Sequence, residues 1–196
     1  MDRPPRRAFV SARASAAFWN CPKAAVEISG PVADDVAMNG VAFLWDAEAV
    51  GGFGAIRIEI DGCDLAELIR SVELPFATAE GHERIAGKYV GLRPWQLDST
   101  AADHFMGGPD SHLCCGPHDK TVLLGCECGK PGCRPLMAQV VVSDRDVAWR
   151  SFEQPHRRGR WEYDAFSGFV FDRAEYEAAL QAPQTTMPDR PTRLSQ

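Results

Sequence analysis

The sequence predicts an α+β fold, with an antiparallel sheet of five to seven strands, two short helices and a long irregular central region. Three observations support this prediction. Short apolar or alternating runs bounded by turn residues recur along the chain, as is typical of strands. Two other segments carry apolar residues at helical spacing behind an aspartate that can cap a helix. Residues 78–120 are rich in Gly, Pro, Asp and His and show little periodicity.

The predicted strands are all short. Residues 41–45 (VAFLW) form an apolar run, and residues 55–60 (AIRIEI) alternate, with the isoleucines on one face. Further strands are predicted at residues 121–125, 136–143, 147–152, 160–163 and 169–171. Because both predicted helices are short, we expect the sheet to carry most of the core.

Two helices are predicted from their capping residues. The first follows Asp64, with Glu67 placed as in a capping box, and Pro75 is expected to end it. The second follows Asp172, and Pro183 is expected to follow this helix.

The chain is expected to contain one globular domain, over residues 41–182, with a Cys/His-rich centre. Residues 1–40 are interpreted as mixed loop. Residues 183–196 are rich in Pro and Thr and are interpreted as a disordered tail. A chain of 196 residues can bury enough surface to fold without a staple.

Composition argues against several classes of protein. The formal net charge of −6 argues against non-specific nucleic-acid binding, which needs a basic face. The chain has no apolar run long enough for a transmembrane helix, and its N-terminal residues lack the apolar core of a secretory signal. Together with an odd number of cysteines, seven, these features predict a soluble cytoplasmic protein.

Cysteines concentrate in the segment 126–133 (CECGKPGC), which contains Cys126, Cys128 and Cys133. Zinc prefers thiolate and imidazole ligands in a tetrahedron, so the sulfurs must converge and the backbone between them must turn tightly. The Gly and Pro residues of the segment favour such a turn. The segment therefore predicts a metal site, with zinc as the expected ion.

Three sulfurs leave a fourth ligand to be found. His156 is expected to supply it, because it follows the strand predicted to pair with the one that leaves Cys133. Cys114, Cys115 and His118, just before the cluster, are the alternatives. Free buried thiols, an oxidised pair and a reactive cysteine with a histidine base are also open interpretations.

The segment 156–160 (HRRGR) is the one basic run, and it is interpreted as a solvated loop. It could instead grip an anion or a phosphate. Aromatic residues surround it in sequence, and they are interpreted as core residues of short strands.

Residues 55–181 resemble a widespread family of uncharacterised bacterial proteins. The likeness lies in the C-x-C-G-x-x-G-C cluster and in the F-x-Q-P-H, W-x-Y and F-x-F-D-R-x-x-Y-E segments that follow it. The resemblance implies a shared fold and groups the three cysteines with His156, but it implies no activity. Arg134 stands where the resemblance leads us to expect an aromatic residue.

Two classes of function remain open. The first is a zinc-stabilised binding module, for example an immunity-type protein, whose negative charge would suit another bacterial protein with a basic surface. The second is a metal- or thiol-dependent enzyme with its site at Cys126, Cys128, Cys133 and His156 and with residues 78–120 as pocket wall. No nucleophile and base stand at a recognisable spacing, which favours the first class. No catalytic residue is assigned.

Overall fold

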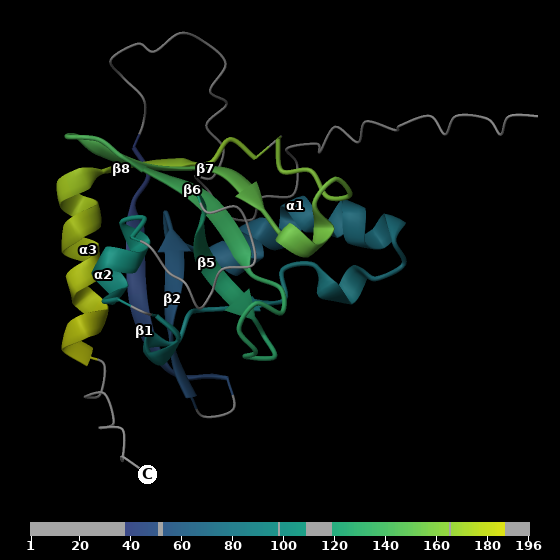
Figure 1. Cartoon of the computed structure of the whole chain (residues 1–196), viewed down its shortest axis with the longest axis horizontal. Helices are drawn as coiled ribbons and strands as arrows, with labels where there is room; N and C mark the ends of the chain where they lie inside the picture. The colour runs from purple at the N-terminus through teal and green to yellow at the C-terminus, as the bar shows by residue number, and fades with distance from the viewer. Residues whose placement is uncertain (1–37, 51–52, 98, 109–118, 165, 187–196) are drawn as a thin grey trace, which may run out of the picture.

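The computed structural model describes residues 38–50, 53–97, 99–108, 119–164 and 166–186 (Figure 1). Within these residues, β-strands form two antiparallel sheets, accompanied by three α-helices and short 3₁₀ helices. The α+β prediction is therefore confirmed. The larger sheet has five strands, within the predicted range, and the three-stranded sheet is additional to it.

The smaller sheet is built from one stretch of chain, in the order β1 (Val41–Val50), β2 (Phe53–Ile60) and β3 (Cys63–Asp64). β1 and β2 form a hairpin whose register sets Phe43 opposite Ile58. Ile56, Ile58 and Ile60 are buried, whereas Arg57 between them is exposed. The alternation seen in the sequence thus marks the face that packs on the core.

The larger sheet has the order β4-β5-β6-β7-β8, and each strand is antiparallel to the next. Its strands are β4 (Tyr89–Val90), β5 (Thr121–Cys126), β6 (Leu136–Val142), β7 (Asp146–Glu153) and β8 (Phe169–Asp172). The strand predicted at residues 160–163 is wrong. These residues follow the 3₁₀ helix η4 (Pro155–Arg157) as turns and loop, and the Trp161 N–H donates to the Arg157 carbonyl (3.0 Å). Trp161 and Tyr163 are buried although they lie in a loop. Their aromatic side chains therefore pack in the core without belonging to a strand.

The two sheets meet beside β4. The Ile56 N–H of β2 donates to the Leu92 carbonyl at 2.8 Å, forming an isolated bridge. A Cβ atom on Gly91 would lie 2.1 Å from the Ile56 carbonyl oxygen, so the absence of a side chain allows the backbones to approach. Buried residues from both sheets consequently belong to a single hydrophobic core.

Helix α1 (Leu65–Ala79) begins as predicted, because the Asp64 carboxylate accepts the Ala66 N–H at 2.8 Å. The prediction that Pro75 ends this helix is wrong, since the helix continues to Ala79. Proline removes one backbone donor. The buried face of the helix nevertheless continues past it to Ala77, and this tertiary packing holds the last turn in place.

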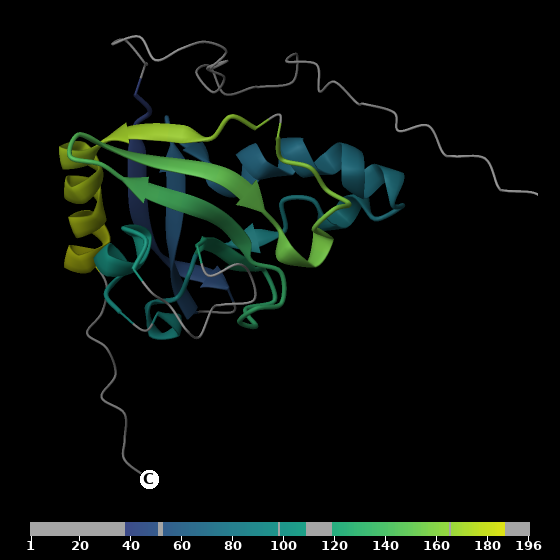
Figure 2. The same ribbon diagram turned by 45° about the horizontal axis from the view of Figure 1, so that its top comes forward.

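Helix α3 (Arg173–Thr186) also begins as predicted, with the Glu175 N–H donating to the Asp172 carboxylate at 3.0 Å. The prediction that Pro183 follows this helix is wrong, because the helix continues through Pro183 to Thr186, so residues 183–186 of the predicted tail are helical. Residues 187–196 of that tail lie outside the described residues, as do residues 1–37. Figures 1 and 2 show α3 alongside β1 at one side of the molecule and α1 at the other.

Residues 78–120, predicted to be irregular, contain several short helices and a strand. These are the 3₁₀ helices η2 (Glu83–Ile85) and η3 (Pro94–Gln96), strand β4 and helix α2 (Ala101–Phe105). Residues 109–118 of this region are not among the described residues. None of the helices that the structure describes is long and apolar enough to cross a membrane.

Candidate metal centre

The loop that joins β5 to β6 brings the three predicted cysteines together. Cys126 is the last residue of β5, and its carbonyl accepts the Gly129 N–H at 2.8 Å, which turns the chain. Gly129 has a φ of +72°, a left-handed conformation that residues with a side chain rarely adopt. The Cys133 N–H then donates to the Lys130 carbonyl at 3.3 Å, which folds the third cysteine back toward the first two.

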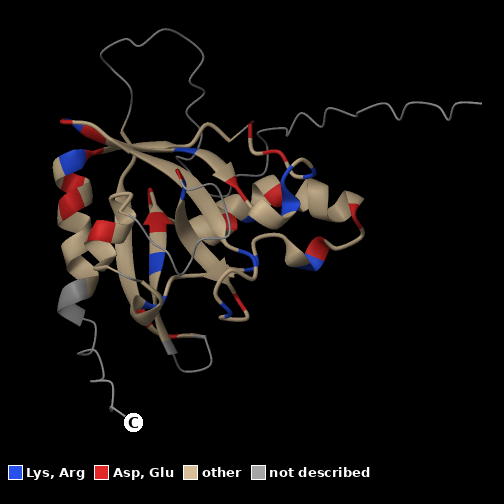
Figure 3. Cartoon of the chain, in the orientation of Figure 1, with Lys and Arg blue, Asp and Glu red and all other residues tan. Residues whose placement is uncertain are grey.

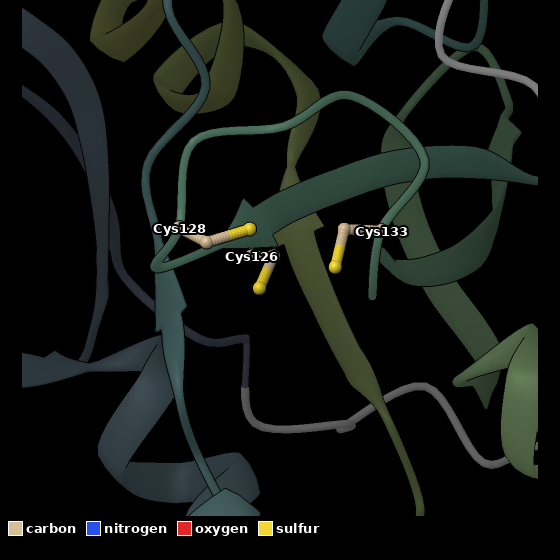
Figure 4. Close-up of side chains that lie close together, drawn as sticks. All are labelled: Cys126, Cys128 and Cys133. Atoms are coloured by element: carbon tan, nitrogen blue, oxygen red, sulfur yellow. The ribbon is translucent and has the colours of Figure 1, made fainter.

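The Sγ atoms of Cys126, Cys128 and Cys133 all lie within 4.8 Å of one another, and Figure 4 shows them directed into a common space. Cys126 is buried, and the other two are exposed. All three are free thiols. In a tetrahedral zinc site the Zn–S distance is about 2.3 Å, so the sulfurs lie about 3.8 Å apart. A small movement of the three cysteines would therefore bring their sulfurs to the spacing that zinc needs. The cluster could therefore hold a metal ion.

Hydrogen bonds shift the pKa values of the two exposed thiols in opposite directions. The Lys130 N–H donates to the Cys128 sulfur, and this is the main cause that lowers the pKa of Cys128. Hydrogen bonds with Cys128 and then with Cys126 raise the pKa of Cys133 to about 11. Sulfurs this close do not all ionise at neutral pH without a cation, because neighbouring negative charges disfavour one another.

Among the described residues, no histidine or carboxylate joins the three sulfurs. His156 lies beside the same loop, where its Nε2 hydrogen-bonds with the Gly132 carbonyl at 2.8 Å. The structure therefore brings His156 to the loop but not into the sulfur cluster, and its role as fourth ligand stays a prediction. Cys114, Cys115 and His118 lie outside the described residues.

Arg134, which directly follows the third cysteine, contacts the cluster. Its Nη2 lies 3.7 Å from the Cys126 sulfur, within hydrogen-bonding reach of sulfur. Burial acts to lower the pKa of Arg134, but the hydrogen bond and the charge of Cys126 outweigh burial and raise it. Sequence reasoning missed this contact, although a basic side chain among candidate thiolates was a visible signal.

A second cluster that sequence reasoning missed surrounds Glu73 of α1, which is fully buried. Its carboxylate accepts hydrogen bonds from the Gly87 N–H (2.8 Å), the Tyr163 hydroxyl (2.6 Å) and the Tyr89 hydroxyl. Burial raises the pKa of Glu73, although these hydrogen bonds act in the opposite direction. Glu73 occupies the helical stripe of Leu65, Ile69 and Ala77, a spacing that could have predicted its burial.

The basic segment 156–160 is engaged in ion pairs. Arg157 and Arg160 approach Glu80 at 2.9 and 3.7 Å, and Arg158 approaches Glu153 at 2.5 Å. Figure 3 shows basic and acidic residues intermixed in this part of the molecule. The pairing agrees with the interpretation as a surface loop rather than an anion-binding patch.

A small hollow borders the cluster on the side of Cys126. Its lining includes Arg93, Gln96, Gly125, Cys126, Gly129 and Lys130. Arg93 and Gln96 come from the region predicted to form a pocket wall. The hollow places two polar side chains from this region beside one sulfur.

Cys63, in β3, differs from the cysteines of the loop because it is disulfide-bonded. The odd cysteine count therefore does not by itself indicate a reducing compartment.

No protein-family model, curated protein or solved structure matches the chain. The function of the chain must accordingly be inferred from its own residues.

Proposed function

We propose that the chain binds one zinc ion through Cys126, Cys128 and Cys133 and that the ion stabilises a binding module. The observation that carries this proposal is the convergence of three free sulfurs within 4.8 Å. Three thiolates suit zinc better than hard cations such as magnesium or calcium, which prefer oxygen ligands. The ion would hold the loop between β5 and β6 in one conformation, which is the role of a structural zinc ion.

His156 is the proposed fourth ligand, and its hydrogen bond supports this role. When Nε2 donates to the Gly132 carbonyl, the unprotonated ring atom is Nδ1, which is then the atom able to bind zinc. Histidine ligands commonly donate their other ring N–H to a carbonyl in this way. To complete the tetrahedron with this hydrogen bond kept, His156 and Gly132 would have to move together toward the sulfurs.

The proposed binding partner is a protein with a basic surface. The chain carries a net charge of −6, and Glu175 and Glu177 are exposed on α3. Opposite charges on two surfaces accelerate association and favour the correct partner.

The first experiment measures zinc by elemental analysis on untagged protein purified without added metal. About one equivalent is expected in the wild type and in Glu127→Gln, which alters an exposed residue of the same loop that is not a candidate ligand. Cys128→Ser should lose the metal, and His156→Gln should bind it more weakly. Metal-free wild-type protein, or Cys128→Ser with full occupancy, would refute the proposal.

Thermal unfolding tests the structural role of the ion. At free zinc near 100 times Kd, binding should stabilise the wild type by about 2.7 kcal/mol, which raises Tm by about 5–10 °C for a chain of this size. Because Cys128 is exposed, Cys128→Ser should match the wild type in chelator and should gain nothing from zinc. Equal gains in both proteins would contradict a role for Cys128 in binding.

The second candidate function is a metal-dependent enzyme, and the hollow beside Cys126 favours it. An open coordination position facing that hollow would let a zinc-bound water react. The cobalt-substituted protein separates the two candidates. If azide or a small thiol changes its visible spectrum, the position is open and an enzyme is favoured; an unchanged spectrum favours the binding module.

A further inference from the structure

Arg134 connects the cysteine cluster to a turn that lies more than 40 residues earlier in the chain. One side of its guanidinium faces the Cys126 sulfur at 3.7 Å. The same group donates to the carbonyls of Ile85 (3.3 Å) and Lys88 (3.5 Å). A guanidinium offers five donors in a fixed plane, so it can serve a sulfur and two carbonyls together.

The turn that Arg134 contacts is held from its other side by the buried carboxylate of Glu73. The Gly87 N–H, inside this turn, donates to Glu73 Oε2 at 2.8 Å. Tyr89, the next residue but one, donates its hydroxyl to the same carboxylate. Tyr89 is also the partner of Cys126 in the pairing of β4 with β5. The sulfur cluster and the Glu73 cluster are thus neighbours, with Arg134 between them.

The charge of a metal-loaded cluster explains why an arginine suits this place. Three thiolates and one divalent ion carry a net charge of −1. The half-buried guanidinium of Arg134 offsets that charge and donates to one of the sulfurs, which stabilises the thiolate. Residues that contact metal ligands in this way commonly change metal affinity by 10- to 100-fold when they are replaced.

We propose that Arg134 is a positioning residue of the metal site, which holds Cys126 and the 85–88 turn in the arrangement that binds the ion. The proposal rests on the function proposed above. It assigns Arg134 no direct contact with the metal. Its consequence is that metal binding and the order of the 85–88 turn reinforce each other.

The test measures zinc affinity by competition with a chromophoric chelator in four proteins. Arg134→Gln should bind zinc about 10- to 100-fold more weakly than the wild type. Arg134→Lys keeps the charge but not the fork of donors, so its affinity should fall between the two. Arg84→Gln makes the same change at an exposed arginine outside the 85–88 turn, and it should change affinity less than about twofold.

Cobalt spectra supply a readout that general destabilisation would not move. Loss of the hydrogen bond to the Cys126 sulfur should shift the thiolate-to-cobalt charge-transfer band of Arg134→Gln to lower energy, since the thiolate becomes easier to oxidise. The spectrum of Arg84→Gln should match that of the wild type. Wild-type affinity and spectrum in Arg134→Gln would overturn the proposal. So would an equal loss of affinity in Arg84→Gln, which would indicate a general charge effect.

Two further outcomes keep the proposals separate. If Arg134→Gln does not fold, the zinc affinity of Arg134→Lys tests the proposal instead. Wild-type zinc affinity in Arg134→Lys would show that the guanidinium donors are not needed, and it would overturn the proposal. If the wild type binds no zinc, the function proposed above fails, whereas zinc binding that is insensitive to Arg134 removes only this inference.

Discussion

At the scale of single residues, Glu73 is the most consequential ionisable group of the core. Three donors from two segments converge on a carboxylate that no solvent reaches, so the side chain fastens α1 to the segment of Gly87 and Tyr89 and to the loop that carries Tyr163. Burial still dominates, and it raises the pKa of Glu73 above its ordinary value of 4.5. Stability should therefore depend on pH through this one group.

The direction of that dependence follows from proton binding. Between pH 4.5 and the higher pKa of the folded state, folded Glu73 binds more protons than unfolded Glu73, so the free energy of unfolding falls as pH rises through this window. Glu73→Gln does not titrate, and urea unfolding at several pH values should show a smaller fall than in the wild type. Glu162→Gln, at an exposed carboxylate, should keep the wild-type slope. A wild type that gains stability relative to Glu73→Gln as pH rises would contradict the shift.

The residues of the candidate site were predictable to different degrees. Cys126, Cys128 and Cys133 are close in sequence, and the glycines between them indicate a turn, so their convergence was accessible from spacing alone. The partners of Arg134 and Glu73 were not, because they come from segments up to 90 residues apart. Only the tertiary fold determines such contacts.

At the scale of elements, the junction between the sheets depends on Gly91. A methyl group there would meet the Ile56 carbonyl oxygen at 2.1 Å, and backbone cannot yield as a flexible side chain can. Gly91→Ala should therefore lower the free energy of unfolding by about 3 kcal/mol. Gly125→Ala is the matched control, because a Cβ on that glycine meets its nearest atom at 3.7 Å, and its effect should stay within about 1 kcal/mol. Chemical denaturation measures both, and equal effects would contradict the close approach.

The secondary-structure predictions were correct where local sequence patterns determine the element, and they were wrong where tertiary packing determines it. The alternation of residues 55–60 and the capping of α1 and α3 were correctly read. The end of α1 was not, because burial beyond Pro75 outweighs one lost hydrogen bond. Residues 160–163 were read as a strand because aromatic residues favour strands, yet they are buried within a loop.

At the scale of the whole molecule, the α+β class was predictable and the division into two sheets was not. Local patterns show which segments are strands but not which strands pair. The bridge joins Ile56 to Leu92, and Leu92 lies in a region without periodicity, so no sequence signal marked their pairing.

Removal of the proposed zinc ion should loosen one part of the molecule and leave the rest intact. The sulfur cluster contacts β4, β5 and, through Arg134, the 85–88 turn, whereas α3 packs on β1 at a distance from these elements. Hydrogen exchange after chelation should therefore rise in residues 85–90 and 126–135 and stay unchanged in β7, β8 and α3. Uniform acceleration across the chain would show instead that the ion supports the entire fold.

The position of α3 has a consequence for synthesis on the ribosome. Tyr176 of α3 packs on Phe43 of β1 with ring centroids 5.5 Å apart, and its hydroxyl donates to the Phe105 carbonyl at 2.8 Å. Among the described elements, a strand made early is thus covered by a helix made more than 120 residues later. While the chain emerges, β1 and β2 can form their hairpin, and Phe105 and Trp149 can pack on Phe43, but the apolar side of β1 is not fully covered until α3 has left the exit tunnel. A nascent chain halted before α3 therefore exposes this apolar surface, and it should aggregate more readily than a chain from which α3 has emerged.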